Sequence, residues 1–175
     1  VNLVGATAGA YTFEYKVLGT APCPDATAVV AVNVINAPNA GTNNTVSACN
    51  NNGAFDLFAS LGGTPDAGGS WTQLSGPSRT ITGNNVDLNG AVAGTYTFEY
   101  EVTGAGPCAD ATAVVTVTVI QAPNAGVNNT VNACNTEAAF NLFTSLSGTP
   151  NAGGVFTQLT GPARTITGNT VNLVG

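Results

Sequence analysis

Hydrophobic and polar residues alternate without a break along residues 94–103, GTYTFEYEVT. Tyr96, Phe98 and Tyr100 occupy every second position, and threonine or glutamate stands between them. A period of two is typical of a β-strand that buries one face. A second apolar stretch, 111–119, follows after a loop that contains glycine and proline. The two stretches predict a β-hairpin within an antiparallel sheet.

The chain repeats itself with a period of 85 residues. Residues 1–85 and 86–170 are identical at 59 of 85 positions without a gap, and residues 171–175 repeat the first five residues again. The hairpin pattern is therefore present twice, first at residues 11–15 and 26–34. A fixed period of this length predicts tandem structural units.

Differences between the two copies of the hairpin are consistent with strands that have one packed face. In the second strand, Thr116 replaces Ala31 and Thr118 replaces Asn33, whereas the valines between these positions are unchanged. Tolerated changes on one face and retained valines on the other predict one solvated and one buried face.

The sequence APNAG, at 37–41 and again at 122–126, is the best candidate for a linker between units. Proline interrupts strand pairing and glycine permits a turn. With this boundary, residues 1–36 are the C-terminal half of one repeat. Residues 37–121 are a complete repeat, and residues 122–175 are the N-terminal part of the next.

Within the complete repeat, the pattern predicts an all-β fold with frequent turns, which indicates an antiparallel β-sandwich or a barrel. The expected strands lie at 45–48, 54–60, 70–74, 80–82, 85–88, 95–102 and 111–120. The residues expected to face inward are Phe55, Leu57, Trp71, Leu74, Ile81, Val86, Leu88, Tyr96, Phe98, Tyr100, Val115, Val117 and Val119.

Composition argues against several classes of function. Only 7% of residues are charged, the net charge is −6, and Lys and Arg together number 3. Nucleic-acid binding needs a basic surface, which this chain does not have, so we expect no nucleic-acid partner. No apolar run approaches the ~18 residues of a membrane-spanning helix. Because the chain has no methionine at its start and no signal-peptide pattern, we expect a mature protein or part of a longer one.

Residue types also argue against catalysis. The chain contains no histidine, so a serine or cysteine nucleophile would have no imidazole base. Lys16 is replaced by Glu101 in the second copy, and no pair of carboxylates is distinguished from the others. We therefore expect neither enzymatic activity nor a bound cofactor.

Four cysteines in a chain rich in threonine, asparagine and glycine predict disulfides and an oxidising compartment outside the cell. Our preferred pair is Cys49–Cys108, which closes a loop that the entropy model values at about 4 kcal/mol. Cys23 and Cys134 would then pair with cysteines of other repeats. The alternative is Cys23–Cys49 with Cys108–Cys134, which would join consecutive repeats, and spacing alone does not decide between them.

Three further residues are candidates for a ligand. Asp25 and its equivalent Asp110 are either loop caps before a strand or carboxylate ligands of Ca²⁺. Trp71 is either a core aromatic residue or a surface on which a sugar ring stacks. The sequence NNT at 43–45 matches the N-glycosylation pattern.

Three segments resemble a repeat of very large cell-surface proteins of Bacteroidetes, which include gliding-motility adhesins exported by the type IX secretion system. These are LGGTPDAGGSW at 61–71, AGTYTF at 93–98 and GPCADATA at 106–113. The resemblance covers essentially the whole chain. It implies tandem immunoglobulin-like or PKD-like sandwiches displayed on a cell surface, and it transfers no catalytic residue.

Our first hypothesis is therefore a structural repeat of an extracellular filament, stalk or giant adhesin, stabilised by disulfides and acting as a spacer. Its partners are neighbouring repeats and other copies in a fibre. One alternative is a module that binds surface carbohydrate or a protein. Another is a filament protomer whose incomplete ends receive strands from neighbouring subunits.

Overall fold

The computed structural model describes residues 1–175 and contains strands and turns but no helix. The chain divides into two compact units, Val1–Gln121 and Ala122–Gly175. The first unit contains an N-terminal hairpin and the residues from Ala37 to Gln121, which we call the middle repeat. We call the second unit the C-terminal unit. With no helix present, no helical segment could span a membrane.

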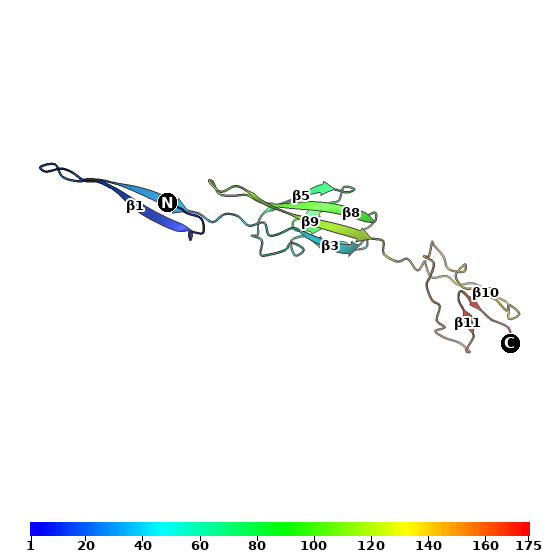
Figure 1. The fold of residues 1–175 in the computed structure, drawn as a ribbon. Helices are drawn as coiled ribbons and strands as arrows, with labels where there is room; N and C mark the ends of the chain where they lie inside the picture. Colours follow the sequence, from blue (N-terminus) through cyan, green and yellow to red (C-terminus); the bar gives the residue numbers. More distant parts are fainter. The chain divides into compact units, whose positions relative to one another are not determined.

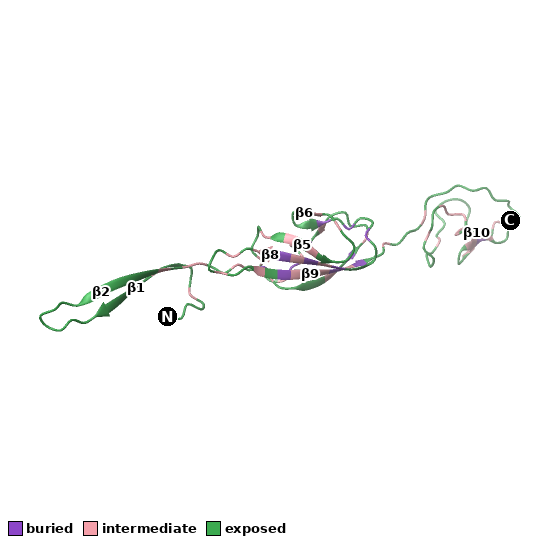
Figure 2. Ribbon diagram, turned by 90° about the horizontal axis from the view of Figure 1, so that it is seen from above, coloured by how far each residue is buried: buried purple, intermediate pink, exposed green.

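The N-terminal hairpin consists of β1 (Gly9–Val17) and β2 (Ala26–Val34) (Figure 1). The strands are antiparallel along their whole length, from Gly9 opposite Val34 to Val17 opposite Ala26. Both faces of this hairpin are largely open to solvent (Figure 2).

The larger sheet of the middle repeat has the strand order β3-β9-β8-β5. Its strands are β3 (Asn44–Cys49), β5 (Ser70–Ser75), β8 (Gly94–Val102) and β9 (Ala111–Ile120). β8 and β9 form a hairpin with the register of the N-terminal one, shifted by the 85-residue period. The alternating residues 94–103 thus contain β8, one of the two central strands of this sheet.

A second, smaller sheet of the middle repeat has the order β4-β7-β6. Its strands are β4 (Phe55–Asp56), β6 (Ile81–Thr82) and β7 (Asn85–Val86). Two sheets built from short strands are consistent with a β-sandwich.

The buried core of the middle repeat lies between the apolar faces of these strands (Figure 2). The inward rows of β8 and β9 are buried, as their alternation predicts, except at the loop end, where Val102 and Ala111 are partly buried. The intervening threonines Thr116 and Thr118 are only partly covered. The largest fully buried side chains are Tyr96, Phe98, Tyr100, Leu57, Leu88, Val86, Val115 and Val117.

One strand pairing differs from the expected antiparallel arrangement, because β3 runs parallel to β9. The register extends from Asn44 opposite Val115 to Cys49 opposite Ile120. Parallel neighbours cannot be joined by a tight turn. Here the chain passes through all the other strands of the repeat between β3 and β9, so no turn constrains their direction.

Two local predictions are wrong. Leu74 was expected to face the core but is 52% exposed, because Trp71 and Gln73 are the inward residues of β5 and alternation places Leu74 on the opposite face. The strand expected at 54–60 ends after Asp56, whose carboxylate accepts a hydrogen bond from the Ala59 N–H at 2.9 Å. Such a side-chain bond stabilises a turn in place of a strand.

The C-terminal unit contains only the smaller sheet. Its strands are β10 (Phe140–Asn141), β11 (Ile166–Thr167) and β12 (Thr170–Val171), in the order β10-β12-β11. Their register is that of β4, β6 and β7, with Phe140 opposite Val171 as Phe55 is opposite Val86. Residues 129–134 and 155–160, the equivalents of β3 and β5, form no strand.

We expect equivalent substitutions in the two hairpins to have very different effects. Phe98→Ala removes a fully buried ring and should lower the free energy of unfolding of the middle repeat by about 3–5 kcal/mol. Phe13→Ala, at the same position of β1, should leave it unchanged. Denaturant unfolding followed by the fluorescence of Trp71, which lies in the middle repeat, measures both. An equal loss of stability would contradict this account of the core.

Candidate functional site

The parallel β3–β9 ladder joins the first and the last strand of the middle repeat by hydrogen bonds. β3 is its first strand and β9 its last. The two run in the same direction, so the chain enters at the start of β3 and leaves at the opposite end, beyond Ile120. The Asn50 N–H continues the pairing and donates to the Ile120 carbonyl at 2.9 Å. A pull on the two ends therefore acts along this ladder.

The linker before the middle repeat is bound to the repeat that it precedes. The Asn39 N–H donates to an Asp66 carboxylate oxygen at 2.9 Å, and the Asp66 N–H donates to the Asn39 carbonyl at 2.7 Å. The Asn39 amide also donates to the Thr64 carbonyl at 2.9 Å. Asn124 makes the same bonds to Asn151 and Thr149 in the C-terminal unit.

Tyr100 has the most elaborate set of contacts among the core side chains. Its ring lies 5.4 Å from the ring of Phe58 and 5.0 Å from that of Trp71, measured between centroids. Its hydroxyl donates to the Asp66 carbonyl at 2.7 Å and accepts from the Gly69 N–H at 2.9 Å. A Cβ at Gly69 would lie 2.6 Å from the tyrosine ring, so the ring requires glycine at this position.

The preferred Cys49–Cys108 disulfide is wrong for this structure. Cys49 lies beside Ile120 at the end of β9, whereas Cys108 precedes Ala111 at its start. A strand of ten residues spans about 33 Å, far beyond the ~7 Å limit between the Cα atoms of a disulfide.

None of the four cysteines is in a disulfide. Cys23, Cys49 and Cys134 are exposed, and Cys108 is half-buried. The Cys108 Sγ atom lies 4.0 Å from the carbonyl oxygen of Ile35, the residue that follows β2. This contact is between the loop of one repeat and the end of the preceding hairpin.

Asp25 and Asp110 occupy the loops of the two hairpins. Asp25 accepts a hydrogen bond from the Gly19 N–H at 2.8 Å, and Asp110 accepts the equivalent bond from Gly104 at 2.8 Å. Asp25 also forms an ion pair with Lys16 at 2.7 Å. The Lys16 ammonium and then the Gly19 N–H lower the pKa of Asp25 from its ordinary value. No group of three acidic, cysteine or histidine side chains gathers around either loop.

Trp71, the candidate for sugar stacking, packs against the core with its ring tilted by 39° to that of Tyr100. Its indole N–H lies 3.3 Å from the Asn84 side-chain oxygen. The side chain is half-buried. These contacts are those of an aromatic residue at the edge of a core.

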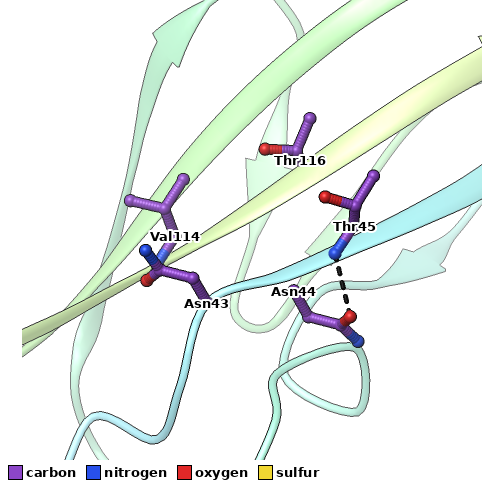
Figure 3. Close-up of a pocket in the computed structure, with 5 residues that line it drawn as sticks. All are labelled: Asn43, Asn44, Thr45, Val114 and Thr116. Atoms are coloured by element: carbon purple, nitrogen blue, oxygen red, sulfur yellow. Dashed lines mark hydrogen bonds between the residues drawn. The ribbon is translucent and has the colours of Figure 1, made fainter.

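The glycosylation pattern at Asn43 lies in an open hollow of about 530 Å³ beside β3 and β9 (Figure 3). The Asn43 side-chain oxygen accepts from the Val114 N–H at 2.8 Å, and the Asn44 amide donates to the Ser60 carbonyl at 2.8 Å. Both asparagine side chains therefore form hydrogen bonds with backbone groups of the same repeat.

We expect the pKa of Asp25 to rise toward its ordinary value in Lys16→Gln, because the cation that favours the carboxylate is removed. A depressed pKa means that the ion pair stabilises the hairpin above the ordinary pKa and that this contribution is lost as the pH falls through the lowered value. Carboxyl ¹³C shifts followed through an acid titration give the value. Lys16→Arg keeps the charge and is the control. An equal pKa in wild type and Lys16→Gln would contradict the assignment.

Comparison with known proteins adds no identification. No protein-family model matches the chain, and no curated protein matches it either. The resemblance to surface adhesins therefore stays a prediction.

Proposed function

We propose that the chain is a structural segment of an extracellular filament, stalk or surface adhesin, built from immunoglobulin-like repeats that transmit tension. The parallel pairing of the first and last strands of the middle repeat supports this proposal most directly. The repeat acts as a spacer, and it carries no reaction.

The direction of the load explains why this pairing matters. When the ends are pulled apart, β3 and β9 slide past each other, so the bonds of the ladder are loaded together. In the usual hairpin geometry the bonds would open one after another. The six paired positions from Asn44 to Cys49 therefore share the force.

The linkers fit the same function. The linker residue Asn39 is held by three hydrogen bonds to residues 64–66, and Asn124 is held in the same way. A linker that is bound to the following repeat transmits force to it directly, because no long unstructured segment has to be extended first. Prolines at 38 and 123 restrict the linker backbone further.

Single-molecule pulling tests this proposal. We expect the middle repeat to resist a pull through the two chain ends more strongly than a pull through Thr45 and Thr116, which lie opposite each other on β3 and β9. Cysteines introduced by Thr45→Cys and Thr116→Cys, in a chain whose four native cysteines are replaced by serine, provide the second pair of handles.

The control is the same serine-substituted chain pulled through its ends. A lower unfolding force for the Thr45–Thr116 pull supports a repeat built to bear tension along its length. Equal forces in both directions, or a middle repeat that opens at the lowest measurable force, would contradict the proposed function.

A further inference from the structure

The two edges of the larger sheet in the middle repeat differ in their protection against pairing with other chains. The strand order places β3 and β5 at these edges. β5 is interrupted by a register shift between Gln73 and Ser75, and an irregularity of this kind is a common way to prevent edge pairing. β3 has an unbroken register against β9 and contains neither a charged residue nor a proline. The outer edge of β3 therefore needs another form of protection.

The residue immediately before β3 can provide it. Asn43 begins the sequence NNT at 43–45, in which the first asparagine is the acceptor of an N-linked glycan and the threonine supplies the hydroxyl that the pattern requires. We propose that Asn43 carries an N-linked glycan that covers the outer edge of β3. This inference rests on the extracellular location that belongs to the proposed function, and it adds a modification to the strand that bears the load.

The Asn43 side chain is held in an orientation that leaves its nitrogen free. One atom of its amide lies 2.8 Å from the Val114 backbone nitrogen. A backbone N–H can only donate, so this atom must be the side-chain oxygen, and the other atom is the Nδ2 that a glycan modifies. No hydrogen bond occupies this Nδ2 atom. A sugar can therefore be attached while the bond from Asn43 to β9 stays intact.

The threonine of the pattern is equally accessible. Asn43 and Thr45 are both exposed. The backbone around them is satisfied by Asn44, whose side-chain oxygen accepts from the Thr45 N–H at 2.9 Å and whose amide donates to the Ser60 carbonyl at 2.8 Å. The Thr45 hydroxyl is thus left without a hydrogen-bond partner. Both groups that a glycosyltransferase has to reach are on the surface.

The hollow beside Asn43 has a lining that suits a sugar (Figure 3). None of its lining residues is charged, and their amide and hydroxyl groups, which can bond to sugar hydroxyls, surround the apolar side chain of Val114. Its volume of about 530 Å³ lies within the ~300–1,000 Å³ that is typical of small-molecule sites. The first sugar can therefore lie against β3 and β9.

The same local arrangement recurs 85 residues later, where NNT occupies 128–130. The Asn129 side-chain oxygen accepts from the Thr130 N–H at 2.9 Å, and its amide donates to the Ser145 carbonyl at 2.9 Å. Asn128 and Thr130 are exposed, like their equivalents. We therefore expect Asn128 to be modified as well. A glycan is bulky and solubilising, and it would supply what a chain with only 7% charged residues does not obtain from charge.

The modification is a glycosyl transfer from a glycosyl diphosphate, in which the anomeric carbon of the first sugar is bonded to a phosphate oxygen. A bond forms between Asn43 Nδ2 and this carbon, and the bond from the carbon to the phosphate oxygen breaks. The diphosphate leaves with the electron pair of the broken bond and takes up the proton that Nδ2 loses. Nothing is oxidised or reduced in this step.

Mass spectrometry of the protein isolated from the cells that produce it tests the modification. Trypsin cleaves after Lys16 and Arg79, so a single peptide contains Asn43. Removal of the glycan by an amidase in heavy-oxygen water converts the modified asparagine into a labelled aspartate. We expect the label at Asn43 and, in the following peptide, at Asn128. A peptide that carries neither a glycan nor the label at Asn43 would overturn the proposal.

Two substitutions of Thr45 show whether the pattern is what directs the modification. Thr45→Ala removes the hydroxyl and should abolish the glycan, although Asn43 is still present. Thr45→Ser keeps the hydroxyl and is the matched control, which should keep the glycan. Denaturant unfolding followed by Trp71 fluorescence checks that the middle repeat is folded in both. Equal modification of Asn43 in the two variants would overturn the assignment.

Association in solution tests whether the glycan covers the β3 edge. At equal concentration, light scattering should give a larger mean mass for Thr45→Ala than for Thr45→Ser. Adding Ser47→Lys to Thr45→Ala places a charge on β3 and should restore the lower mass. Equal masses for the three chains would overturn the covering role.

The outcome of these tests is independent of the proposed mechanical function. Pulling measures the resistance of the β3–β9 ladder, whereas mass spectrometry measures only the modification of the residue that precedes it. An unmodified Asn43 therefore leaves the load-bearing proposal standing, and a weak ladder leaves the glycan standing.

Discussion

The structure depends on contact between a two-stranded hairpin and the rest of a repeat. In the middle repeat this contact buries Tyr96, Phe98 and Tyr100 together with the valines of β9. In the N-terminal hairpin the same residues pair in the same register but remain largely exposed. A single hairpin has too little apolar surface to stand alone as a folded unit. The sandwich core is therefore the product of two parts, and each part by itself is only half of it.

Mechanical continuity follows from the same arrangement. β9 is both the last strand of the hairpin and the partner of β3, so the strand that closes the core also receives the load from the first strand. The next linker begins immediately after Ile120 and is bound to the following unit through Asn124. Under the proposed function, core formation and the transmission of force would use the same strand, β9.

Local pattern was sufficient for the hairpins, because alternation over nine or ten residues specifies both the strand and its buried face. It was insufficient where the outcome depends on contacts distant in sequence. The parallel pairing of β3 with β9 joins strands about 70 residues apart, and periodicity carries no information about direction. Cys49 and Cys108 were paired from their spacing, which does not say that they lie at opposite ends of one strand.

The sequence contained a signal for the surroundings of Tyr100 that only the structure explains. Glycine is present at the equivalent positions 69 and 154. Only the folded middle repeat shows that a side chain at position 69 would occupy the space of the Tyr100 ring. Leu74 was misassigned because its apolar side chain was expected to be inward, although alternation from Trp71 places it on the outer face of β5.

Amide hydrogen exchange in β2, compared with β9, tests most directly whether a hairpin is stable only when it is packed in a repeat. We predict that β2 exchanges rapidly in dilute solution, while β9 is protected by the core of the middle repeat. Protection of β2 that equals that of β9 would contradict the account.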